Sequence, residues 1–92
     1  MMSYWVYILT NYRNTTLYIG VTNNPIKRID QHKRGLGSAF TAKYNLHKLI
    51  YLEEAQNPYD AISREKQLKG WSRARKDELI NRVNPGWEEI IL

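Results

Sequence analysis

Two short apolar segments separated by turn-forming residues constrain the fold of this chain more than any other feature. Residues 5–10 and 17–21 are rich in β-branched and aromatic residues, and the sequence Asn-Tyr-Arg-Asn-Thr begins the stretch between them. This pattern is typical of two antiparallel strands joined by a short connection. We therefore predict that the chain opens with a β-hairpin.

The register of this hairpin decides how Tyr7 and Tyr18 lie relative to each other. A symmetric loop with an even number of residues, either 11–14 or 12–13, would pair Tyr7 directly with Tyr18 on one face of the sheet. A loop with an odd number of residues would shift the register by one and send the two side chains to opposite faces. The sequence is compatible with either arrangement.

Two later segments share a helix-start signal, an asparagine followed by a proline. Asn24 and Asn57 are expected to cap helices, because asparagine is a favoured cap and proline is favoured at the first helical position. The first helix is predicted over residues 25–34, with Gly35 as its stop, and the second runs from residue 58 to a stop at Gly70.

The remaining segments complete a small layered domain. We predict a third strand over residues 47–53, a third helix over 73–83, and a mobile, glycine-containing loop over 35–45. The resulting order, ββαβαα, indicates a single α/β domain over residues 1–92, in which about three helices pack on a three-stranded, mainly antiparallel sheet.

Basic residues outnumber acidic ones and are clustered. The chain has 14 Lys and Arg against 9 Asp and Glu, a net charge of +5. Residues 13–48 contain seven basic residues and one acidic residue, Asp30, and residues 61–82 contain another seven basic residues. Such clustering predicts a polyanionic partner, either nucleic acid or an anionic membrane.

The sequence lacks cysteine and a recognisable signal peptide or membrane span, which limits the classes of function to consider. The chain has no cysteine, which excludes disulfides, thiolate nucleophiles and cysteine-ligated zinc. The opening apolar stretch lacks a basic flank and is too short for a signal peptide or a membrane span, so we expect a cytoplasmic protein with no membrane partner.

Arg28 and His32 lie four residues apart on the first predicted helix and therefore share a face. Beside the free N–H groups of the helix N-terminus they would form a phosphate site. The alternative is a solvated basic face with His32 at the surface or at the boundary of the core.

Glu65 falls on or beside the apolar stripe of the second predicted helix, between Ala61 and Leu68. A buried carboxylate is costly unless it is paired or bound to a metal. Glu65 is therefore either a boundary or ion-paired residue, or a metal ligand in a cleft.

Five residues on the hairpin and the first two helices have a spacing known from one enzyme family. The triplet Tyr18-Ile19-Gly20 follows Trp5-Val6-Tyr7, with Tyr18 eleven residues after Tyr7, and Arg28 stands ten residues after Tyr18. With His32 and Glu65, they make the chain resemble the small stand-alone members of the GIY-YIG nuclease family.

The resemblance implies a metal-dependent endonuclease that hydrolyses DNA phosphodiester bonds, with RNA as the alternative substrate. It implies that Glu65 holds one Mg²⁺ or Mn²⁺ and that Arg28 neutralises charge on the phosphoryl oxygens. It also implies that Tyr18, or alternatively Tyr7 or His32, orients or deprotonates the attacking water. The basic residues expected to bind nucleic acid are Lys27, Lys33, Arg34, Lys43 and Lys69.

The chain departs from the family pattern in several places. Trp5 replaces the first glycine, Val21 stands where some relatives have a lysine, and Asn81 or Asn84 is a candidate for a site asparagine. No recognition domain is attached, which predicts weak sequence specificity or recognition of a DNA structure, as in repair or recombination.

Two other function classes compete with the nuclease hypothesis. One is a non-catalytic nucleic-acid-binding domain with a vestigial site, which would explain the positive charge equally well. The other is a protein-interaction module that uses Trp71 and Trp87.

Overall fold

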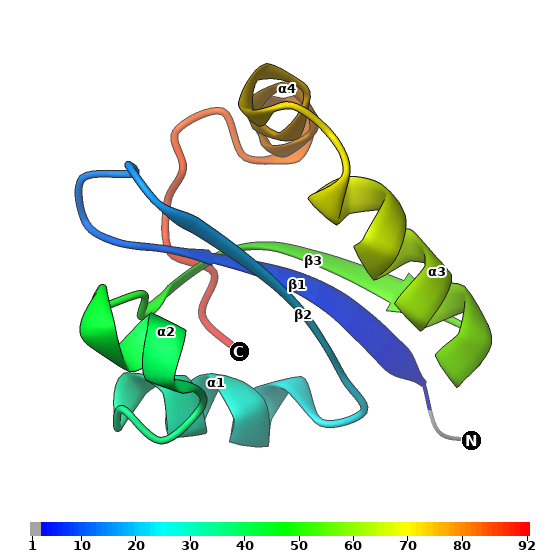
Figure 1. The fold of residues 1–92 in the computed structure, drawn as a ribbon, viewed down its shortest axis with the longest axis horizontal. Coiled ribbons are helices and arrows are strands. Elements are labelled where there is room, and N and C mark those ends of the chain that lie inside the picture. Colours follow the sequence, from blue (N-terminus) through cyan, green and yellow to red (C-terminus); the bar gives the residue numbers. More distant parts are fainter. Residues whose placement is uncertain (1–2) are drawn as a thin grey trace.

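Three antiparallel strands form the centre of the fold. The computed structural model describes residues 3–92; the first two residues of the predicted domain lie outside the described range. Strands β1 (Tyr4–Thr10), β2 (Leu17–Thr22) and β3 (Lys48–Ala55) pair in the order β2-β1-β3 (Figure 1). The predicted three-stranded antiparallel sheet is confirmed.

The hairpin loop is longer than either predicted even loop. It spans residues 11–16, so Tyr7 pairs with Gly20 and Tyr18 pairs with Leu9. The direct pairing of Tyr7 with Tyr18 that a loop of 11–14 or 12–13 would give is therefore wrong. Because the loop still has an even number of residues, Tyr7 and Tyr18 remain on the same face of the sheet, with the Ile8–Ile19 pair between theirs.

The helices begin at the predicted caps. Helices α1 (Pro25–Lys33), α3 (Pro58–Lys69) and α4 (Arg73–Val83) match the predicted segments closely. The Asn24 side chain accepts a hydrogen bond from the Lys27 N–H at 3.1 Å, and the Asn57 side chain accepts one from the Asp60 N–H at 2.9 Å. These bonds satisfy N–H groups that a helix start otherwise leaves free.

Part of the predicted mobile loop is a short helix. Within residues 35–45, α2 (Ala39–Lys43) forms behind a Ser38 cap, whose hydroxyl accepts from the Thr41 N–H. The Thr41 side chain is fully buried. The loop prediction is wrong here because five residues are too few for the apolar periodicity by which helices are recognised.

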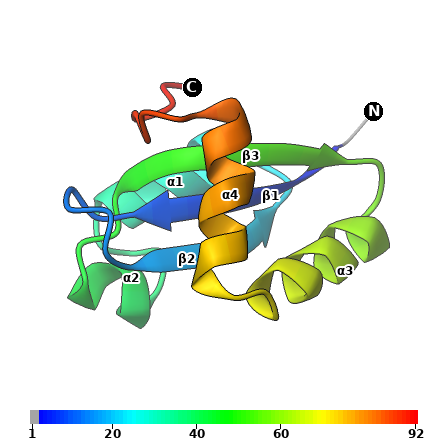
Figure 2. The same cartoon turned by 90° about the horizontal axis from the view of Figure 1, so that it is seen from above.

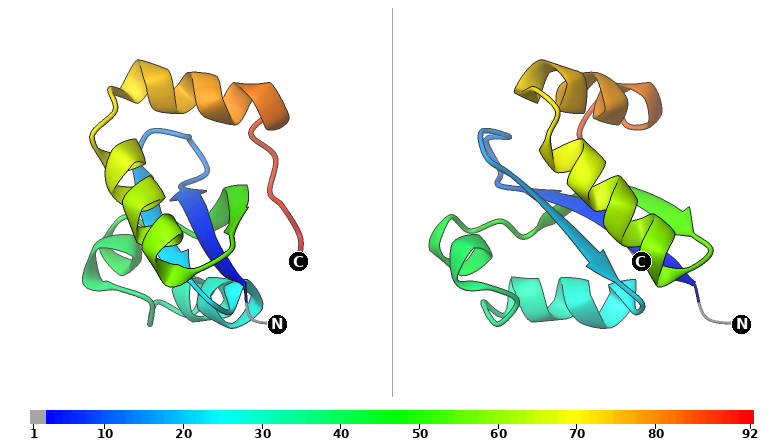
Figure 3. Two further views of the ribbon diagram at one scale, coloured as in Figure 1. Left: turned by 90° about the vertical axis from the view of Figure 1, so that its right-hand side faces the viewer. Right: turned by 45° about the vertical axis from the view of Figure 1, so that its right-hand side comes forward.

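The helices lie on both faces of the sheet. In Figures 1, 2 and 3, α1 and α2 lie on one side of the sheet and α3 and α4 on the other. Val6 and Ile8 of β1 belong to the core under α3 and α4, whereas Tyr7 and Leu9 pack with Ile29 of α1. A central strand buried on both faces explains the continuous apolar run in β1.

The C-terminal segment returns alongside β3 (Figure 2). The Ile90 N–H donates to the Leu49 carbonyl at 2.8 Å, and the Asn84 amide donates to the Ile50 carbonyl at 3.0 Å. This contact covers part of the exposed edge of the sheet. Among residues 3–92, no helix has the length and apolar character needed to cross a bilayer.

Candidate active site

The glycine of the Tyr18-Ile19-Gly20 triplet makes room for Tyr7. Gly20 lies opposite Tyr7 in the β1–β2 ladder. A Cβ atom on Gly20 would lie within 3.0 Å of three Tyr7 atoms, including the hydroxyl oxygen. The Tyr7 phenol therefore lies over the backbone of the edge strand at a position that only glycine permits.

The Tyr7 hydroxyl is hydrogen bonded to His32. Its oxygen lies 2.9 Å from His32 Nε2, and both side chains are 0% exposed. The surface position considered for His32 is therefore wrong. α1 presents this ring to the sheet on its buried face, in the turn after Ile29, which packs in the same core.

Thr41 holds the other side of the His32 ring. His32 Nδ1 lies 2.9 Å from Thr41 Oγ1, and this hydroxyl donates to the Ser38 carbonyl at 3.2 Å. Thr41 Oγ1 also lies 2.9 Å from Ser38 Oγ, so its one proton has more than one acceptor within reach. When that proton goes to the Ser38 carbonyl, Thr41 accepts from His32, which carries its proton on Nδ1. Nε2 is then unprotonated and accepts the hydrogen bond from the Tyr7 hydroxyl.

Burial keeps both groups neutral. Burial, with smaller contributions from Arg28 and His47, lowers the pKa of His32 below its ordinary value. Burial and the neighbouring Tyr18 raise the pKa of Tyr7 to about 12, while Arg28 opposes this rise. Tyr7 is therefore a protonated donor at neutral pH and does not act as a free phenolate.

Tyr18 is the more accessible of the two tyrosines. Its ring centroid lies 6.2 Å from that of Tyr7 and 5.6 Å from that of His32, which it meets at an angle of 60°. Tyr18 is only partly buried, whereas Tyr7 and His32 are fully enclosed. Water can reach the tyrosine of the second motif but not that of the first.

Arg28 and Glu65 come to this cluster from helices on opposite faces of the sheet. Both side chains influence the Tyr7 phenol: the Arg28 guanidinium lowers its pKa and the Glu65 carboxylate raises it. A cation on α1 and an anion on α3 therefore both act electrostatically on one hydroxyl. Opposite charges near a phenol are suited to binding a phosphate together with a cation.

The Glu65 carboxylate makes one long ion pair and is partly accessible to solvent. Its side chain is 20% exposed, and its carboxylate lies 3.6 Å from Lys69 Nζ on the same helix. Arg64, its neighbour in sequence, pairs instead with Glu53 at 2.9 Å. A long pair to a half-exposed lysine contributes little stability.

The donor set fits a hard divalent cation that keeps its waters. Residues 3–92 contain no cluster of three His, Asp or Glu side chains that would enclose a metal. A site with Glu65 as its single carboxylate suits Mg²⁺ or Mn²⁺, because such ions retain water and bind substrate oxygens. Zinc is a poor fit, since it prefers several protein ligands.

The five basic residues predicted to bind nucleic acid fall into two groups. Lys27 lines a hollow with Arg28 at the end of β2, Lys69 is beside Glu65, and Lys43 is on α2. The other two, like Lys69 with Glu65, have acidic partners: Lys33 pairs with Glu89 at 2.6 Å and Arg34 with Asp30 at 3.0 Å. Their role in binding stays a prediction.

The two candidate asparagines have structural roles. Asn81 accepts a 2.6 Å hydrogen bond from the Trp87 indole, and Asn84 contacts the backbone of Ile50 and Glu88. Both follow or belong to α4, on the face of the sheet opposite Tyr7. Both side chains hold the C-terminal segment against the domain, and their role in the site stays a prediction.

Sequence reasoning missed the residues that support His32. Thr41 and Ser38 lie in the segment predicted to be a loop, and Gly37 approaches the His32 ring so closely that a Cβ there would collide with it. The local signal that could have found them is Ser38 itself, because serine is a favoured helix cap. Its hydroxyl accepts a hydrogen bond from the backbone N–H three residues later, here that of Thr41.

Comparisons with known proteins agree with this geometry. The model of the GIY-YIG catalytic domain matches residues 3–78. A UPF0213 protein of Clostridium perfringens is 40% identical over 77 residues, which cover 84% of this chain and 82% of that protein. A UPF0213 protein of Syntrophus aciditrophicus is 38% identical over 86 residues, which cover 92% of this chain and 97% of that protein.

A solved structure has the same fold. The solution NMR structure of a UPF0213 protein from Bacillus halodurans matches with a TM-score of 0.61 and 26% identity, over 95% of this chain and 92% of that one. The fold and the match to the family model define a catalytic domain of the nuclease type. The chain belongs to the GIY-YIG family.

Proposed function

We propose that the protein is a metal-dependent endonuclease that hydrolyses DNA phosphodiester bonds. The observation that carries this proposal is the packing of the partly exposed Tyr18 against the buried, hydrogen-bonded pair of Tyr7 and His32. His32 lies on the helix that also carries Arg28. The clustered positive charge of the chain supports a polyanionic substrate. Membership of the GIY-YIG family supports phosphodiester chemistry.

The accessible tyrosine contacts the attacking water in this proposal. Tyr18 orients the water through its hydroxyl, while Tyr7 keeps its own proton in the bond to His32. The packing of Tyr18 against both rings fixes its direction. His32 and Tyr7 are thus positioning residues, and a well-fixed geometry is itself a large part of catalysis.

The charged residues act on the phosphate. Arg28 neutralises the charge that develops on the phosphoryl oxygens in the transition state. Glu65 holds the cation, which supplies Lewis-acid stabilisation of the phosphate when bound. Lys27, in the same hollow as Arg28, holds the neighbouring phosphate of the strand.

The test is cleavage of labelled branched, nicked, single-stranded and linear duplex DNA in Mg²⁺ or Mn²⁺. Wild-type protein is expected to cleave, and Glu65→Gln, Arg28→Ala and Tyr18→Phe are each expected to lose activity. Glu78→Gln is the matched control, because Glu78 is an exposed glutamate on α4. Salt-sensitive binding with no cleavage under any condition would contradict the proposal and favour a non-catalytic binding domain.

The interaction-module hypothesis has less support. Trp71 is half-buried, and the guanidinium groups of Arg64 and Arg75 lie 5.4 and 4.1 Å from its ring centroid. Trp87 is also half-buried and donates its indole N–H to Asn81. Both rings are engaged within the domain.

A further inference from the structure

A row of aromatic rings leads from the buried His32 to the surface of α2. The Tyr18 ring, next to His32, stacks on Phe40 with centroids 6.2 Å apart and an interplanar angle of 29°. Phe40 in turn contacts Tyr44, with centroids 4.8 Å apart. We call Tyr18, Phe40 and Tyr44 the aromatic row.

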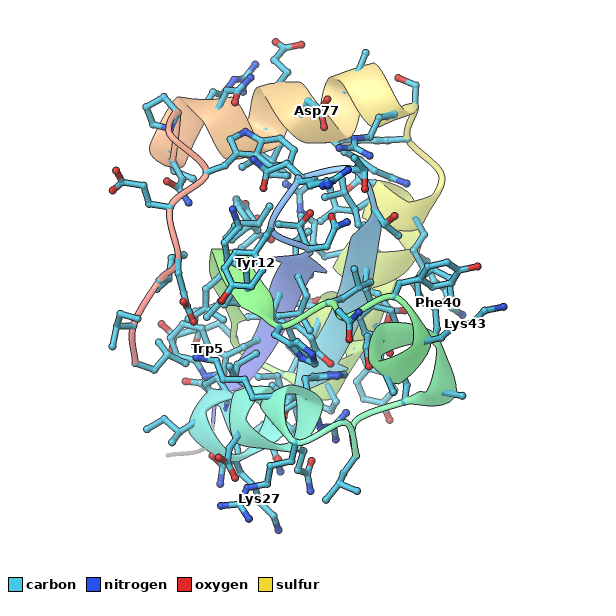
Figure 4. All side chains as sticks on the ribbon, turned by 90° about the vertical axis from the view of Figure 1, so that its left-hand side faces the viewer. Trp5, Tyr12, Lys27, Phe40, Lys43 and Asp77 are labelled. Carbon is cyan, nitrogen blue, oxygen red and sulfur yellow. The ribbon has the colours of Figure 1, made fainter. Side chains whose placement is uncertain are left out.

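The outer part of the aromatic row faces solvent. Phe40 is 44% exposed and Tyr44 is 43% exposed, although large rings gain free energy from burial. The inner face of α2 is held by Thr41, which is bonded to His32. Figure 4 shows Phe40 and Lys43 on the outer side of this helix. The two rings are therefore held in place from beneath and remain open above.

One cation lies directly against the row: Lys43 Nζ is 5.3 Å from the centroid of the Tyr44 ring. Residues 31–52 contain no acidic residue, and of their four basic residues Lys33 and Arg34 pair with Glu89 and Asp30. Exposed rings beside cations are the chemistry that binds single-stranded nucleic acid, because bases stack on the rings and the cations contact the phosphates.

We propose that Phe40 and Tyr44, with Lys43, form a binding site for an unpaired nucleobase and its adjoining phosphate. The site is continuous with Tyr18 through the aromatic row, so it rests on, and refines, the proposed nuclease function. Bases within a duplex are stacked on their neighbours and cannot lie on a protein ring. The preferred substrate is therefore DNA that is single-stranded or splayed beside the phosphate to be cleaved.

Binding is measured in EDTA, so that cleavage does not interfere, with a single-stranded oligonucleotide carrying 2-aminopurine and with its duplex. Wild-type protein is expected to bind the single strand more tightly and to quench the 2-aminopurine fluorescence by stacking. Phe40→Leu and Tyr44→Leu keep an apolar side chain but remove the ring, and each is expected to weaken single-strand binding by about 5- to 150-fold. Phe40→Trp keeps a stacking surface and is expected to retain affinity and quenching.

Tyr59→Leu is the matched control, because Tyr59 is 80% exposed on α3 and lies outside the aromatic row. Its affinity is expected to equal that of wild type. Tyr44 contacts Phe40 rather than Tyr18, so Tyr44→Leu tests the site without changing the support of Tyr18. Thermal unfolding followed by circular dichroism confirms that each variant is folded.

Unchanged affinity and quenching in both leucine variants would overturn the proposal, and so would equal binding of single strand and duplex. Failure of this proposal is distinguishable from failure of the nuclease proposal. If the leucine variants bind normally while Glu65-dependent cleavage persists, only the base site is lost. If binding depends on the rings but no DNA is cleaved, only the nuclease proposal fails.

Discussion

The hydroxyl oxygen of Tyr7 lies 2.9 Å from Nε2 of His32, with both side chains fully buried. This bond joins the first strand of the sheet to α1 at the point where the sequence motifs of the family meet. Because Thr41 Oγ1 lies 2.9 Å from the other nitrogen of the imidazole, both ring nitrogens have partners within the fold. Stability and catalysis should therefore respond together to changes in either residue.

Removing one partner of this pair is expected to destabilise the protein. Tyr7→Phe leaves His32 Nε2 buried without a donor, which costs about 1–3 kcal/mol in the free energy of unfolding. His32→Phe leaves the Tyr7 and Thr41 hydroxyls unpaired at a similar or larger cost. Urea denaturation of both variants and of the double variant measures the coupling. Simple additivity of the two effects would show that the bond contributes nothing.

The lowered pKa of His32 predicts acid sensitivity. The unfolded chain binds a proton at His32 with a pKa near the ordinary value of 6.5, whereas the folded protein resists protonation there. The unfolded state then binds more protons, so the free energy of unfolding falls as pH drops below about 6.5 and levels off below the folded pKa. Denaturation midpoints between neutral and acidic pH should show this decline in wild type.

His32→Gln provides the control for the acid effect, since it removes the titrating group and leaves His47 in place. Its unfolding free energy should be lower at neutral pH but should change less on acidification. An identical pH slope in wild type and His32→Gln would assign the decline to other groups.

Much of the fold follows from local patterns in the sequence. The strands of the hairpin and the asparagine-capped helices were predictable because each signal lies within a few residues of the element that it starts or ends. The length of the hairpin loop was not predictable, because residues 11–16 are held in part by a residue far away in the sequence. Arg73 of α4 donates to the carbonyls of Asn14 and Thr15 at 2.6 and 2.8 Å, 58 or more residues along the chain.

The candidate site divides in the same way. Tyr7, Tyr18, Arg28, His32 and Glu65 have a sequence spacing that the family resemblance makes visible. The support of His32 by Thr41 and Gly37 depends on where the five-residue helix α2 packs. A helix this short has too few residues to show the apolar periodicity that would predict its position. The difference in exposure between Tyr7 and Tyr18 likewise depends on the register, which lies two residues from the one that would pair the tyrosines directly.

Gly20 should be sensitive to the smallest substitution. Gly20→Ala puts a methyl group against the Tyr7 ring and hydroxyl, and such overpacking typically costs about 1–3 kcal/mol. The displaced hydroxyl should also lose its bond to His32. Urea denaturation is expected to show a lower midpoint, and a change smaller than the experimental error would contradict the close contact.

The contact can be separated from any backbone effect of alanine with a second substitution. Tyr7→Leu shortens the side chain, so Gly20→Ala should cost less in a Tyr7→Leu background than in wild type. Tyr7→Phe keeps the ring that alanine would meet, and in that background the cost should persist. Equal costs in all three backgrounds would assign the effect to the strand itself.

Lys69 is expected to compete with a metal ion for Glu65. Its ammonium group lies 3.6 Å from the carboxylate, and it is 54% exposed, so solvent screens much of the attraction. Lys69→Met should remove this competitor and tighten Mn²⁺ binding by up to about fivefold, while Glu65→Gln should abolish it. Titration followed by the electron paramagnetic resonance of free Mn²⁺ measures both affinities.

The gain in Mn²⁺ affinity from Lys69→Met should shrink as salt is added, because screening also weakens the Lys69–Glu65 pair in wild type. Mn²⁺ binding that is equal in wild type and Glu65→Gln would remove Glu65 from the metal site.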